Sequence, residues 1–178
     1  MSDGCRKENL GGGLGVSDST ASFSAVVDGV AWSTDSVAGY LSYEYVSKAR
    51  VMTITGYGKK RLISISLKDT SLSAPGSNDS TLAVQSYSVG GWGNASAFQY
   101  GYNMMVYGAN VVWQQEGNAV SGSAAVTAAD GEKKLISGTF EFSAKAWSVD
   151  SAGTLSAGTM QVSSGIFKNV HYTYFRRP

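Results

Sequence analysis

Cysteine, proline, histidine and charge are all scarce in this chain of 178 residues, which contains one cysteine, two prolines and one histidine. A single cysteine excludes an intrachain disulfide and a zinc cluster built from cysteines. The lone histidine, His171, argues against a metal site made of several imidazoles, and a serine-histidine-aspartate relay would depend on it alone. No Gly-x-Ser-x-Gly motif accompanies it, so we expect a structural or exposed histidine and no metal site.

Charged residues make up only 15% of the chain, and the formal net charge is +1. Binding to nucleic acid or to an anionic membrane usually needs a broad basic surface, which this composition does not supply. The short basic runs Lys59-Lys60-Arg61 and Arg176-Arg177 fit a solvated turn and tail. No apolar run approaches the roughly 18 to 20 residues that a membrane-spanning helix needs. From the low charge we expect no nucleic-acid partner, and from the lack of such a run we expect no membrane-spanning helix.

Residues 1–21 differ in composition from the rest of the chain. They are polar and rich in glycine and serine, and residues 11–15 read GGGLG. Such a segment cannot bury enough apolar surface to offset the entropy lost on ordering. We predict a flexible tether over residues 1–21 and one β domain over residues 22–178, which is long enough to enclose a hydrophobic core of its own.

Alternation of apolar and polar residues dominates the chain from Phe23 onward. In residues 136–144, every second residue is apolar or glycine and the residues between them are Ser, Thr or Glu, as expected of a strand with one buried face. No segment carries an apolar stripe of helical period over ten residues. The expected strands are 22–27, 31–32, 37–46, 50–57, 61–68, 81–89, 104–107, 111–115, 119–128, 134–147 and 154–167. This pattern predicts an all-β domain, either an antiparallel β-sandwich or a closed or partly closed β-barrel of about 8 to 11 strands.

Three blocks of the sequence together resemble a known family. Residues 23–32, FSAVVDGVAW, are similar to its opening pattern F-x-A-x-(V/I)-(D/N)-G-x-x-(W/F), and residues 136–144, ISGTFEFSA, to its strand I-S-G-T-F-x-F-x-A. Residues 164–170, SGIFKNV, together with Tyr172, resemble its closing pattern x-G-x-F-x-N-(V/I)-x-(Y/F). In this order, over residues 22–172, the blocks resemble a family of uncharacterised, domain-of-unknown-function lipoproteins of Bacteroidota-type bacteria.

The resemblance implies a cellular location more than a catalytic activity. Members of this family carry an export signal, a lipid-acceptor cysteine, a polar tether and one β domain, so Cys5 would be the lipidated residue, with the small Gly4 before it. Asp3 departs from the family's pattern, and no hydrophobic signal region precedes Cys5 in the sequence as given. The resemblance thus implies an exported protein, periplasmic or on the cell surface, attached to the outer membrane only through the lipid on Cys5.

Two sets of side chains are candidates for chemistry or binding. Glu44 and Glu141 are the carboxylates in mid-strand, and glycoside hydrolysis would need them about 5 to 9.5 Å apart in one cleft. We expect instead that Glu141, on the Ser/Thr face of its strand, is solvated and lies opposite a lysine. The aromatic and amide side chains around a glycine-rich loop could stack on sugars or hold apolar ligands, or else cap the core. These candidate ligand-binding residues are Trp92, Asn94, Tyr100 and Tyr102.

The sequence and the resemblance together favour a non-enzymatic, exported cell-envelope lipoprotein that acts in binding or assembly without a cofactor. Its candidate partners are a glycan, an envelope protein or a small apolar ligand. One alternative is a lipocalin-like barrel around a small apolar ligand, with Met52, Met104 and Met160 lining an adaptable cavity. A second alternative is a hydrolase with an unrecognised carboxylate site.

Overall fold

The computed structural model describes residues 20–58, 61–71, 80–88, 97–105, 111–149 and 155–175. Every element in these ranges is a β-strand, so the all-β prediction is confirmed. None of the described residues forms a helix that could span a bilayer. The strands are β1 (Ser22–Val27), β2 (Val30–Ser33), β3 (Ser36–Glu44), β4 (Ala49–Gly58), β5 (Arg61–Asp69), β6 (Ser86–Ser88), β7 (Ala97–Met105), β8 (Val111–Asp130), β9 (Leu135–Val149) and β10 (Leu155–Phe175).

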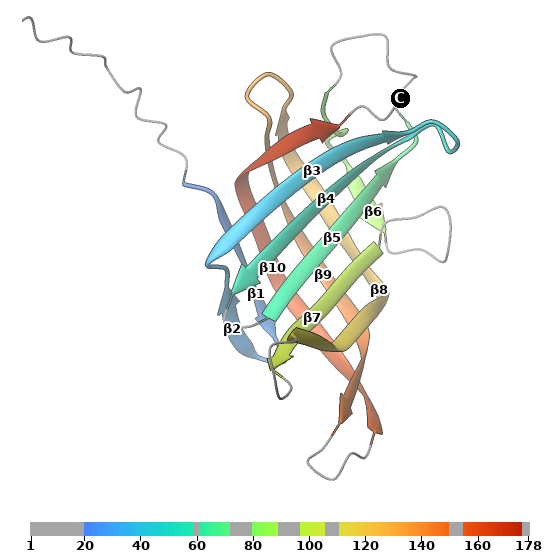
Figure 1. Ribbon diagram of the computed structural model, residues 1–178. Coiled ribbons are helices and arrows are strands. Elements are labelled where there is room, and N and C mark those ends of the chain that lie inside the picture. Colours follow the sequence, from blue (N-terminus) through green and yellow to red (C-terminus); the bar gives the residue numbers. More distant parts are fainter. Residues whose placement is uncertain are drawn as a thin grey trace, which may run out of the picture.

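The strands form two packed layers in a sandwich-like arrangement (Figure 1). One layer, called here the β9 sheet, has the order β2-β1-β10-β9-β8-β6. The other, the β4 sheet, has the order β10-β3-β4-β5-β7-β8. The long strands β8 and β10 belong to both: residues 111–118 of β8 pair with β7 and residues 119–130 with β9. In β10, residues 155–171 pair with β9 and residues 172–175 with β3.

The expectation of purely antiparallel pairing was wrong at one place. The end of β10 runs parallel to β3, with Tyr172 opposite Gly39 and Phe175 opposite Ser42, while the other pairs are antiparallel. This parallel pair exists because β10 continues to Phe175, past the end that the alternation predicts at Phe167. The final residues thereby reach the neighbouring layer and join its edge.

Strands β8 and β10 are longer than the sequence predicts, and both contain β-bulges. The register shifts between Ala119 and Ser121 in β8 and between Val162 and Gly165 in β10, and each of these strands has a second shift farther along. A bulge places two residues opposite one and so inverts the alternation of inward and outward side chains. The second shift in β10, between Phe167 and Val170, coincides with the end that the alternation predicts for this strand. In β8 the predicted break falls instead at Glu116-Gly117-Asn118, polar and turn-favouring residues that lie within one continuous strand. Of the strand predicted at residues 81–89, the structure describes residues 81–88, and within these only Ser86–Ser88 is a strand.

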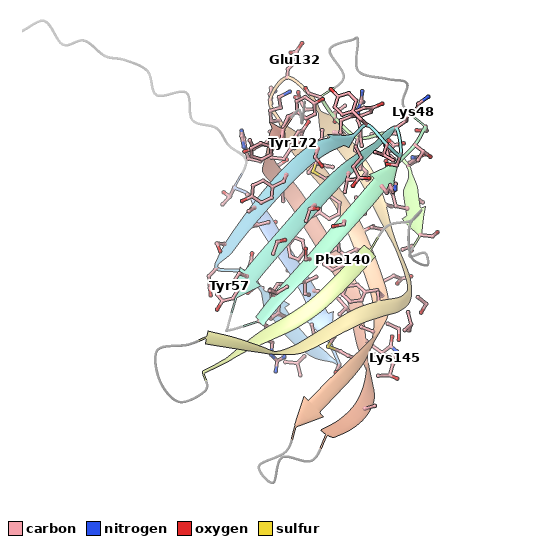
Figure 2. All side chains as sticks on the ribbon, turned by 45° about the vertical axis from the view of Figure 1, so that its right-hand side comes forward. Lys48, Tyr57, Glu132, Phe140, Lys145 and Tyr172 are labelled. Carbon is pink, nitrogen blue, oxygen red and sulfur yellow. The ribbon has the colours of Figure 1, made fainter. Side chains whose placement is uncertain are left out.

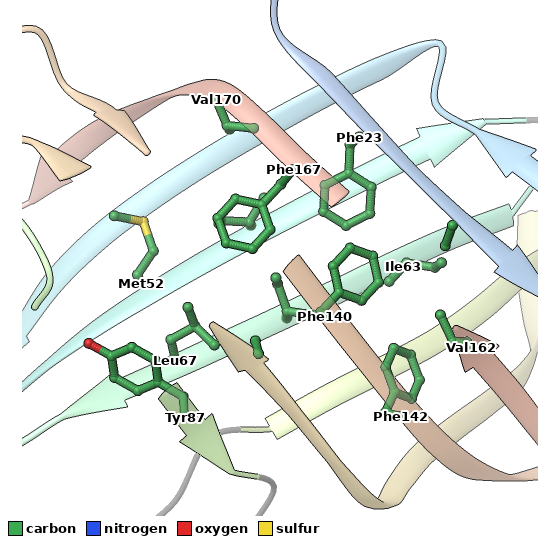
Figure 3. Packing of buried hydrophobic residues seen from close by; sticks show 14 of the residues in the cluster. Phe23, Met52, Ile63, Leu67, Tyr87, Phe140, Phe142, Val162, Phe167 and Val170 are labelled. Carbon is green, nitrogen blue, oxygen red and sulfur yellow. The ribbon is translucent and has the colours of Figure 1, made fainter. Parts of the chain in front are cut away.

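The core lies between the two sheets and consists of packed rings and aliphatic side chains (Figure 3). The ring of Phe140 lies 5.0 Å from that of Phe23 and 6.4 Å from that of Phe167, measured between centroids. The predicted inward residues of β5 and β9 are buried, as are Met52 and Met160. Burial of this apolar surface is the main force that stabilises the fold.

Candidate functional site

An open pocket of about 340 Å³ lies on the β9 sheet and spans β8, β9 and β10. It is called here the outer-face pocket, because its exposed side chains lie on the face of the sheet away from the core. Two buried residues, Phe140 and Gly165, form its floor, with the Phe140 ring directed into the core between the layers (Figures 2 and 3). Its lining residues are Ser123, Ala125, Thr139, Phe140, Glu141, Ser164, Gly165 and Ile166.

Strand register brings these residues together. Ala125 of β8, Thr139 of β9 and Ile166 of β10 lie in one row across the sheet. In the next row Ser123 faces Glu141, and β10 contributes its bulge. The pocket is therefore a product of pairing between segments about 15 to 40 residues apart in the sequence.

The bulge in β10 fixes a strained serine at this pocket. Ser164 has a φ of 50°, a left-handed backbone conformation that residues other than glycine, asparagine and aspartate rarely adopt. It lies in mid-strand rather than in a turn. Gly165 follows, and a Cβ there would lie 2.5 Å from the Phe140 carbonyl oxygen. Bulges of this kind re-aim side chains beside functional sites, and local strain tends to concentrate there.

Glu141 is the carboxylate of the outer-face pocket. It is exposed, as predicted, but the lysine partner expected for it is not found among the described residues. Glu44 lies elsewhere, at the end of β3 in the β4 sheet, where it accepts a hydrogen bond from Ser47 at 2.8 Å and pairs with Lys68 at 3.7 Å. Glu141 lines the pocket and Glu44 does not, so the structure does not bring the two candidate acids together there.

Among the remaining predicted site residues, His171 has a described side chain, and it does not line this pocket. His171 is exposed on β10 opposite Leu135, in agreement with the expectation of a structural or exposed histidine. Cys5, Trp92 and Asn94 lie outside the described residues. Tyr100 and Tyr102 belong to β7, opposite Ile63 and Arg61 of β5, and their side chains are likewise outside what the structure describes. So is the side chain of Met104.

A buried polar cluster, which the sequence analysis did not single out, lies at one end of the sandwich. Asp69 is 1% exposed, and its Oδ1 accepts hydrogen bonds from the Ser71 backbone N–H at 2.8 Å and from the Ser71 hydroxyl at 2.6 Å. Its Oδ2 accepts from the Ala83 N–H at 2.9 Å and lies 3.3 Å from the Tyr87 hydroxyl. Arg50, also 1% exposed, lies directly opposite Asp69 on β4 and donates to the Thr81 carbonyl at 3.1 Å.

The electrostatics of the cluster favour a charged Asp69 and neutral tyrosines. Burial alone raises the pKa of Asp69, but the hydrogen bonds from Ser71, Ala83 and Tyr87 outweigh it and leave that pKa below its ordinary value of 3.8. Burial raises the pKa of Tyr87 and of Tyr172. The Tyr172 hydroxyl accordingly donates to the Ser80 carbonyl at 2.6 Å, at the end of the molecule that carries Glu132 (Figure 2).

This cluster is structural. Its hydrogen bonds hold residues 80–88 across the end of the sandwich, where Leu82 is buried, and Lys134 adds contacts to Ser80 and Gly131. The sequence does contain a signal for it. Asp69 continues the inward series of Ile63, Ile65 and Leu67 at two-residue steps, so the alternation places a carboxylate in the core.

Comparison with known proteins gives a family and no function. A model of the family described as a domain of unknown function, DUF6252, matches residues 19–171. No curated protein and no solved structure matches the chain. The matched range includes β1 and the outer-face pocket, and it ends within β10. Because the match covers most of its length, the chain belongs to the DUF6252 family.

Proposed function

We propose that this chain is the binding or assembly module of an exported cell-envelope lipoprotein, attached to the outer membrane through a lipid on Cys5. The observation that carries the proposal is the outer-face pocket, an open depression across three paired strands that is lined by both polar and apolar groups. Binding sites are usually concave and preformed in this way. Two features of the sequence support the location at the cell envelope. They are the polar residues 1–21 before the domain and the ordered blocks that resemble envelope lipoproteins.

Binding fits the pocket better than hydrolysis does. Glycoside hydrolases use a pair of carboxyl groups on either side of the scissile bond, one as acid and the other as base or nucleophile. The lining of the outer-face pocket holds the single carboxylate of Glu141, and its other polar side chains are the hydroxyls of Ser123, Thr139 and Ser164. Such a set can hold a ligand but offers no acid-base pair.

The packed interior favours a ligand on the surface over one inside a barrel. Met52 and Met160, two of the three methionines expected to line a cavity, are buried among the core residues. The rings of Phe23, Phe140 and Phe167 occupy the space between the sheets (Figure 3). A lipocalin-like carrier would need that space for its ligand.

Metabolic labelling tests the anchor. When the complete gene is expressed in its native host with labelled palmitate, we expect label on the wild-type protein and recovery of that protein with the outer membrane. The Cys5→Ala variant lacks the acceptor thiol, so it should carry no label and leave the membrane fraction.

The matched control is Ser17→Ala, which changes one atom in the same N-terminal segment and keeps the thiol. It should label like the wild type. Absence of label on the wild type, or equal label on Cys5→Ala, would disprove the lipoprotein proposal.

A further inference from the structure

We propose that the outer-face pocket binds an uncharged carbohydrate, with the Glu141 carboxylate accepting hydrogen bonds from two neighbouring hydroxyls of one sugar. This inference rests on the proposed function as a binding module and names the class of its ligand. It rests on residues other than the loop aromatics that the sequence suggested.

The lining of the pocket can both donate and accept hydrogen bonds. Ser123, Thr139 and Ser164 carry hydroxyls, and a hydroxyl both donates and accepts. The exposed carboxylate of Glu141 only accepts, through two oxygens with about four lone-pair sites. A sugar presents several adjacent hydroxyls that also donate and accept, so it can satisfy both kinds of group at once.

The pocket also has an apolar part. Ile166 is 48% exposed, and it lies in one row with Thr139 and Ala125 beside the polar groups. Sugar rings are amphipathic, because their C–H groups form an apolar face next to the hydroxyls. Burying part of Ile166 against such a face would add a hydrophobic contribution of roughly 25 cal/mol for each Å² removed from water.

The charged side chains around the pocket bear on the charge of its ligand. The nearest cations on this face of the described strands are Lys168, two residues beyond Ile166, and Lys145, four residues beyond Glu141. At a rise of about 3.4 Å per residue they lie roughly 7 Å and 14 Å along their strands from those positions. A cationic ligand would approach two lysines for a single carboxylate, and an anionic one would face Glu141 at the centre. The surroundings therefore favour a neutral ligand.

The hydroxyl character also continues beyond the pocket, which leaves room for more than one sugar. On β6, Ser86 and Ser88 lie opposite Ala125 and Ser123, and on β1 Ser24 lies opposite Ile166. Five strands spaced about 4.8 Å apart make this band roughly 19 Å wide. An oligosaccharide laid across the strands could use the pocket for one unit and the serine band for its neighbours.

The test is a glycan array of neutral, uronic-acid and amino-sugar oligosaccharides probed with the purified chain, followed by calorimetric titration of the strongest ligand. We expect a neutral oligosaccharide to bind and the affinity to fall at least tenfold in Glu141→Gln, which converts one of the two acceptor oxygens into a donor. In Ser164→Gly, which keeps the left-handed backbone and removes one hydroxyl, we expect a loss of severalfold.

The matched control is Glu132→Gln, the same substitution at an exposed turn outside the pocket, and its affinity should equal that of the wild type. Failure of every neutral oligosaccharide to bind, unchanged affinity in Glu141→Gln, or displacement of the sugar by a lysine-rich peptide would each overturn the inference. Because this assay uses the purified chain, its outcome is independent of the palmitate test, and each proposal can fail without the other.

Discussion

Replacing Asp69 with asparagine is expected to lower the free energy of unfolding by about 3 kcal/mol, since a buried carboxylate that accepts several hydrogen bonds is costly to disrupt. Both oxygens of Asp69 accept hydrogen bonds, from Ser71 on one side and from Ala83 on the other. The NH₂ group of asparagine would direct its own N–H toward a group of Ser71 or Ala83 that also donates, so that hydrogen bond would be lost. Urea denaturation of wild type and variant at pH 7 measures the loss.

Asp130→Asn is the matched control for this substitution. Asp130 lies at the turn between β8 and β9, where its Oδ1 accepts from the N–H groups of Glu132 and Lys133 at 3.0 and 2.9 Å. Its Oδ2 lies 3.9 Å from Lys133 Nζ, an exposed ion pair that contributes little to stability. The amide oxygen of asparagine can replace the Oδ1 acceptor, so we expect a change within about 0.5 kcal/mol. If Asp69→Asn loses no more stability than Asp130→Asn, the hydrogen bonds of Asp69 do not stabilise the fold in the way proposed.

Lowering the pH should also show that the ionised Asp69 stabilises the fold. Because the folded state holds the pKa of Asp69 below its ordinary value of 3.8, the ionised group stabilises the fold at every pH above that value. This contribution is lost as the pH falls from about 3.8 through the lower folded pKa. We therefore expect the stability difference between wild type and Asp69→Asn to be constant near neutral pH and to shrink below pH 4. A difference that stays constant down to pH 2 would show that the charge of Asp69 is not involved.

Adding one methyl group at Gly138 is expected to destabilise the protein by about 3 kcal/mol or more, because overpacking a filled site forces its neighbours to move. A Cβ at this position would lie 2.2 Å from the Ala125 carbonyl oxygen and 2.4 Å from Cζ of Phe167. The carbonyl belongs to the paired strand β8 and the ring is fully buried, so neither can move freely. In thermal unfolding, Gly138→Ala should lower Tm by roughly 6 to 12 °C.

Gly158→Ala provides the control for added volume in a strand. Gly158 is exposed on β10, and a Cβ there would meet no atom within 4 Å. Alanine restricts the unfolded chain more than glycine does, so we expect Tm to stay the same or to rise slightly. If both variants lost the same stability, the close approach of β8 and Phe167 to Gly138 would not explain the effect.

Much of the fold can be predicted from the sequence, since burial on one face of a sheet imposes a local period of two. The alternation in residues 136–144 correctly predicts a strand with Phe140 and Phe142 facing the core, and residues 61–68 do the same for Ile63, Ile65 and Leu67. The Asp28-Gly29 turn is predicted as well, and both residues have the positive φ that a tight hairpin requires. These features depend on residues close together in the chain.

The candidate site was predictable only in fragments. Exposure of Glu141 follows from its position in the alternating strand, but its neighbours do not. Ser164 comes to lie beside it because a bulge in β10 breaks the alternation, and bulges leave no reliable local signature. Asp69 is similar: its inward position follows from the alternation, whereas its partner Ala83 comes from a segment predicted as a strand.

The sequence by itself determined an all-β chain, the inward faces of its strands and its resemblance to an uncharacterised family, because these depend on local alternation and on short ordered motifs. Only the tertiary structure decided that β8 and β10 join two sheets, that β10 ends parallel to β3, and that three strands meet in a pocket around Glu141. The physical reason is that strand register is a long-range property. A shift of one residue reverses the direction of every side chain beyond it, so the contents of the pocket depend on pairing between distant segments.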